Sequence, residues 1–81
     1  MKLTNERTLN NVIKDLTSTI LGYIEDLKKE PKTDWNTATM LAYFECLTAI
    51  KCEMLPNEAR FGLDGNLEEK YGLNEYLNRK E

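Results

Sequence analysis

The chain has 81 residues, 41% of them apolar and 31% charged, and a net charge of −3 at pH 7. This composition predicts a single domain over residues 1–81 and excludes a disordered chain. The sequence contains no histidine, so the commonest general base and zinc ligand is missing. The longest apolar run, Met40–Phe44, is too short to cross a bilayer, and the N-terminus has no apolar stretch of a secretory signal.

The first predicted element covers residues 5–29. Val12 and Ile24 flank a row of apolar side chains three or four residues apart, namely Leu9, Ile13, Leu16, Ile20, Tyr23 and Leu27. This spacing is typical of one face of an amphipathic helix. Thr4 is a suitable N-cap, and Pro31 prevents the helix from continuing.

Gly22 falls on the polar side of this helix. A glycine in a helix interior costs about 0.5–1 kcal/mol relative to alanine. One interpretation is a tolerated surface position. In the other, Gly22 lets a second backbone approach closely and belongs to a partner-binding surface.

A second helix is predicted over residues 35–55, with Asp34 or Thr33 as its N-cap and Pro56 as its end. Phe44 accompanies its main apolar face, which comprises Met40, Tyr43, Leu47, Ile50 and Met54. A thinner face comprises Ala38, Ala42, Cys46 and Ala49. A helix that is apolar around most of its circumference lies between neighbours.

Matching apolar faces and a short connection predict that the two helices form a long antiparallel hairpin. Positions equidistant from a turn at residues 30–34 then face each other. The resulting contact layer is expected to contain Leu16, Ile20, Tyr23, Tyr43, Leu47 and Ile50. Because the second helix is apolar on more sides than one partner helix covers, two hairpins are expected to pair into a homodimer.

Residues 57–79 contain a repeat with a period of ten. Arg60-Phe61-Gly62-Leu63-Asp64 aligns with Lys70-Tyr71-Gly72-Leu73-Asn74. Glycine after an aromatic residue is typical of a helix that ends in the left-handed conformation, and Asn66 with Glu69 resembles a capping box. The segment therefore predicts two or three short helices folded over the hairpin, and the fold class is all-α. The alternative is a duplicated ligand-binding element.

The chemistry of the side chains argues against catalysis. Cys46 and Cys52 are six residues apart on one helix, so their thiols point about 120° apart and cannot form a disulfide. We expect buried or half-buried, reduced cysteines in a cytoplasmic protein. No catalytic residue, metal site or cofactor site is predicted. Acidic residues interleave with the basic ones, which disfavours direct nucleic-acid binding, and no membrane association is expected.

Two further residues are candidates for a binding surface. Trp35 stands in the first turn of the second helix, where tryptophan closes the end of a core; the alternative is a binding hot spot. Glu45 lies among three alanines, either as a solvated carboxylate or as the acidic anchor of a shallow groove. The candidate partner-binding residues are Gly22, Trp35, Ala38, Ala42, Glu45 and Ala49.

These features predict a small cytoplasmic protein-interaction or regulatory module, such as an accessory, inhibitor, antitoxin-like or immunity-like protein, without enzymatic activity. One alternative is a helical protein that binds a small molecule. Another is a nucleic-acid-associated accessory protein that acts through a protein partner.

Overall fold

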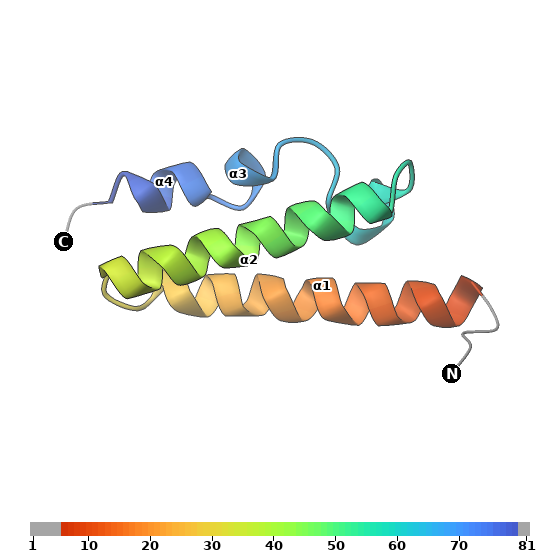
Figure 1. Cartoon of the computed structure of the whole chain (residues 1–81), viewed down its shortest axis with the longest axis horizontal. Coiled ribbons are helices and arrows are strands. Elements are labelled where there is room, and N and C mark those ends of the chain that lie inside the picture. Colours follow the sequence, from red (N-terminus) through yellow and green to blue (C-terminus); the bar gives the residue numbers. More distant parts are fainter. Residues whose placement is uncertain (1–5, 80–81) are drawn as a thin grey trace.

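The structure is a computed structural model that describes the backbone of residues 6–79 and the side chains of residues 8–79. Its elements are α1 (Glu6–Lys28), α2 (Asp34–Glu53), the 3-10 helix η1 (Glu58–Phe61), α3 (Leu67–Lys70) and α4 (Leu73–Leu77). The described residues contain no strand. Figure 1 shows α1 and α2 antiparallel and side by side, with α3 and α4 along the other side of α2. The all-α prediction of a long hairpin followed by short helices is confirmed.

Local chemistry sets the bounds of the long helices. Thr33 is the N-cap of α2, and its hydroxyl accepts the backbone N–H of Asn36 at 3.0 Å. Helix α2 ends at Glu53, two residues before the predicted end, because the residue preceding Pro56 disfavours helical backbone angles. The predicted N-cap of the first helix, Thr4, lies outside the described residues.

The buried side chains form one cluster to which the C-terminal third contributes half. The cluster comprises Ile20, Ile24, Met40, Phe44, Leu47, Phe61, Leu63, Leu67, Leu73 and Tyr76. Both α3 and α4 contact α2, and η1 contacts α1. The C-terminal helices therefore cover a side of α2 that α1 leaves open, whereas the thinner face of Ala38, Ala42, Cys46 and Ala49 stays exposed.

The predicted contact layer between the long helices is correct only in part. Ile20 and Leu47 are buried, and the rings of Tyr23 and Tyr43 are in contact. However, Leu16 is 47% exposed and Tyr23 is 51% exposed, so neither belongs to the core. Because the C-terminal segment packs against another side of α1, the buried face of this helix is rotated towards Thr17 and Ile24.

The ten-residue repeat provides turns and core residues. Gly62 and Gly72 both adopt the left-handed conformation, with φ angles of 74° and 80°. The Tyr71 hydroxyl in the second copy donates to the Gly62 carbonyl in the first at 2.5 Å. Asn66 caps α3 by accepting the backbone N–H of Glu69 at 3.1 Å. The prediction of helices ended by glycine is confirmed.

Candidate interaction surface

The predicted partner-binding residues do not form one continuous surface. Trp35 is 80% exposed, so the prediction that it closes the core is wrong. The reason is its phase: Trp35 shares a side of α2 with Ala42 and Ala49, seven and fourteen residues later, and this side faces away from the core. Gly22 is exposed on α1, and a methyl group added there would meet nothing within 4 Å.

Glu45 lies on a different side of α2 from Trp35. It lines a cavity of about 350 Å³ between α2 and the short C-terminal helices, together with Leu41, Phe44, Thr48, Glu68 and Leu73. Ala38, Ala42 and Ala49 are exposed outside this cavity. Glu45 therefore lines a cavity between Leu41 and the α3–α4 segment, which differs from the shallow groove among alanines considered in the sequence.

Both cysteines are exposed free thiols, which corrects the expectation that they are buried or half-buried. Cys46 lies three residues after Tyr43 and four before Ile50, on the side of α2 next to α1. Cys52 lines a cavity beside Gly65 and Asn66, on the side of the C-terminal segment. The two thiols thus report on different sides of α2, about 120° apart.

The most extensive exposed apolar feature on α1 is one that the sequence assigns to the core. It is a row of four side chains with helical spacing and exposed fractions between 38% and 51%, named here the α1 stripe: Leu9, Val12, Leu16 and Tyr23. These residues lie three, four and seven positions apart and therefore share one face of α1. The spacing was visible in the sequence, whereas the side of α1 that the C-terminal segment covers was not.

One end of the α1 stripe borders a small cavity between the two long helices. This tyrosine cavity has a volume of about 180 Å³ and is lined by Tyr23, Asp26, Leu27, Glu30 and Tyr43. The two tyrosine rings are 5.8 Å apart between centroids and are tilted by 32°. Two aromatic rings and two carboxylates thus surround one space, an arrangement that suits a cation.

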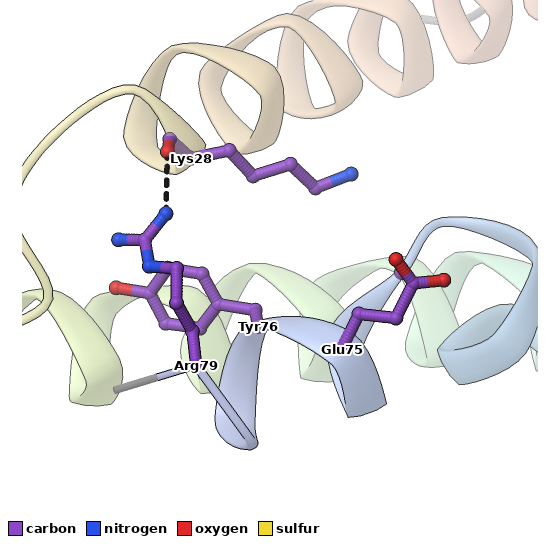
Figure 2. A pocket seen from close by; sticks show the side chains of 5 residues that line it. Lys28, Glu75, Tyr76 and Arg79 are labelled. Carbon is purple, nitrogen blue, oxygen red and sulfur yellow. Dashed lines mark hydrogen bonds between the residues drawn. The ribbon is translucent and has the colours of Figure 1, made fainter. Parts of the chain in front are cut away.

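A further cavity of about 250 Å³ lies where α4 approaches the end of α1 (Figure 2). Its cationic groups have partners within the chain: the Arg79 guanidinium donates to the carbonyls of Lys28 and Glu30 at 2.7 and 2.8 Å. The Lys28 ammonium pairs with Glu25 at 2.8 Å. Lys32, in turn, donates to the carbonyls of Leu77 and Arg79. These bonds place positive charge at helix C-termini and attach the C-terminal segment to the hairpin.

The remaining charged chemistry is local. Lys70 and Asp64 form an exposed ion pair at 2.8 Å, and this hydrogen bond lowers the pKa of Asp64 and raises the pKa of Lys70. Within residues 8–79, no group of three or more His, Cys, Asp or Glu side chains could hold a metal ion. Among the described helices, none is long and apolar enough to span a membrane.

Comparison with known proteins adds no family. No family model, no curated protein and no solved structure matches the chain.

Proposed function

We propose that the protein is a non-catalytic, cytoplasmic interaction module that assists or regulates another protein, as accessory, inhibitor, antitoxin-like and immunity-like proteins do. The observation that supports this proposal is the α1 stripe, whose four large apolar side chains are 38% to 51% exposed on one helix face. Large apolar side chains that repeat along one exposed helix face, unlike singly scattered ones, are typical of surfaces that bind a partner.

The side-chain chemistry of the chain favours a binding function over a catalytic one. It also favours a reducing compartment. The sequence has no histidine to serve as a general base near neutral pH. Its two cysteines are exposed free thiols, and such thiols persist where the cytoplasm keeps them reduced.

Self-association is a separate question from partner binding. The sequence predicts a homodimer because α2 is apolar around most of its circumference. In the structure α1 and the C-terminal helices cover part of α2, and Ala38, Ala42 and Ala49 stay exposed. The homodimer stays a prediction. Light scattering at micromolar concentration tests it, since a dimer that disappears in Leu16→Asp would assign the α1 stripe to a second copy of the chain.

Affinity capture from the native host, with two matched variants, tests the proposed function. Leu16→Asp introduces a charge into the α1 stripe, and Ser18→Asp introduces the same charge at an exposed position outside the stripe. We expect a specific protein to be retained by the wild-type chain and by Ser18→Asp, and to be lost from Leu16→Asp while the circular dichroism spectrum is unchanged. If no captured protein depends on Leu16, the proposal is wrong.

A further inference from the structure

We infer that the α1 stripe and the tyrosine cavity together bind one amphipathic helix of a partner protein, with apolar side chains against the stripe and a lysine or arginine in the cavity. This inference rests on the proposed function and specifies the chemistry of the partner. It follows from the shape of the surface, its charge and the composition of the cavity.

The inferred binding groove is the surface between the α1 stripe and the neighbouring exposed side chains of α2. On the α2 side, Tyr43, Cys46 and Ile50 share a face next to α1, and Tyr43 contacts Tyr23 of the stripe. Further round α2, the small Ala42 and Ala49 are both exposed, and the exposed Trp35 stands at the start of the same side. A row of large side chains on one helix beside small ones on its neighbour leaves room for a third helix to pack against both.

The length of the groove sets the length of the occupant. Leu9 and Tyr23 are fourteen residues apart, which corresponds to about 21 Å along the helix axis. Glu30, in the wall of the tyrosine cavity, lies seven residues beyond Tyr23. A partner helix of about 20 residues would therefore cover the stripe and reach the cavity.

The exposed side chains beside the groove are mainly acidic, although Lys29 stands between Asp26 and Glu30. Exposed carboxylates surround it at Asp15, Asp26, Glu30 and Glu53. The described lysines of the two long helices lie elsewhere: Lys28 pairs with Glu25, and Lys51 donates to the Gly65 carbonyl. Lys14 lies two residues from Val12 and two from Leu16, which corresponds to about 200° of helix rotation from each. It therefore points away from the α1 stripe. An apolar centre with an acidic rim is complementary to a helix with apolar anchors and basic flanks.

The tyrosine cavity marks the place along the groove where a basic side chain of the partner would bind. The faces of tyrosine rings attract cations, and carboxylates accept charge-assisted hydrogen bonds from lysine and arginine. Tyr23 and Tyr43 supply the rings, and Asp26 and Glu30 supply the carboxylates, in one space of about 180 Å³. The geometry therefore assigns the cavity to a basic side chain at one end of the bound helix.

The same charges disfavour the other occupants. A second copy of the chain would bring an equally acidic groove face, among the described residues, against this one. Nucleic acid and anionic lipid surfaces carry negative charge and select Lys and Arg around an apolar surface. A basic partner would bring opposite charge to the rim carboxylates.

Two synthetic peptides of about 20 residues provide the probes. Both place leucine with i, i+3, i+7 spacing on one face and differ only in carrying lysine or glutamate on the other. Isothermal titration calorimetry with the full chain should show the lysine peptide binding at least about tenfold more tightly than the glutamate peptide, with an affinity that falls as salt increases. Asp26→Asn with Glu30→Gln should weaken binding about tenfold, whereas the matched Glu68→Gln with Glu75→Gln should change it less than about twofold.

The two exposed thiols locate the bound peptide. Labelling by a maleimide should slow at Cys46, next to the groove, in proportion to the bound fraction. It should stay constant at Cys52, which points about 120° away from Cys46, on the side of the C-terminal segment. Slower labelling at Cys52 alone would place the peptide against the C-terminal segment and overturn the assignment.

Other outcomes separate this inference from the proposed function. Equal binding of both peptides, or an equal loss in the two carboxylate double variants, refutes a basic partner. A Leu16-dependent dimer that excludes the lysine peptide shows that a second copy occupies the groove. Loss of a captured host protein in Leu16→Asp, without any binding of the lysine peptide, overturns the basic helix but leaves the interaction module standing.

Discussion

Leu47 and Leu16 are the same residue type in two environments, and replacing each by alanine tests the core described above. Leu47 is fully buried, so alanine removes its packing and leaves a cavity, at a cost of about 2–5 kcal/mol. Leu16 is 47% exposed, so the same change forfeits about half of a transfer energy of about 1.5–3 kcal/mol and leaves no enclosed cavity. We therefore expect Leu16→Ala to cost about 1 kcal/mol or less.

Urea denaturation followed by far-ultraviolet circular dichroism measures both losses. A chain of this size has a total free energy of unfolding of about 4–12 kcal/mol, so Leu47→Ala should shift the midpoint strongly and Leu16→Ala only slightly. Comparable losses at the two positions would mean that Leu16 belongs to the core, as the hairpin register alone predicts, and the described rotation of α1 would be refuted.

Further predictions concern single residues. Gly22→Ala should stabilise the chain by about 0.5–1 kcal/mol in the same assay, since the site is open and helical. Gly62→Ala should destabilise it by at least about 1 kcal/mol, because the φ angle is 74° and the added carbon would lie 2.9 Å from a hydroxyl. Trp35 should emit like a solvated indole before and after unfolding; a blue-shifted native spectrum would contradict its 80% exposure. The pKa of Asp64 should be lower than usual by nuclear magnetic resonance and return upwards in Lys70→Met. Because the folded-state pKa is the lower one, this carboxylate stabilises the fold above its unfolded-state pKa, and the contribution disappears as pH falls through the folded-state pKa.

Periodicity predicts the helices of this chain better than it predicts their packing. The 3-4 spacing in residues 9–27 and 40–54, together with two prolines, places α1 and α2 within two residues of their bounds. The same spacing cannot decide which part of a broad apolar face is buried. That choice depends on Phe61, Leu63 and Tyr76, whose contacts with the hairpin have no periodic signature.

The candidate binding surface shows the same limitation. Tyr23 and Leu16 have the spacing of core residues, and only the position of the C-terminal segment leaves them on the surface. Trp35 is exposed because of its position on the α2 helix relative to the buried face, and this position can be read from the sequence. The preference of tryptophan for core boundaries favours the opposite prediction. The acidic rim is readable from the sequence once the buried face of α1 is known.

Because the core combines side chains of the hairpin with side chains of the C-terminal segment, it cannot form completely until that segment has been translated. Ribosomes deliver the hairpin first, yet half of the buried cluster comes from Phe61 to Tyr76. A nascent chain that ends before these residues presents Met40, Phe44 and Leu47 without their cover. The hydrogen bonds that Lys32 and Arg79 donate between the hairpin turn and the end of α4 form later still. Folding is therefore completed only after the α4 segment has been translated, and translation products that lack this segment would expose apolar surface that proteases and chaperones recognise.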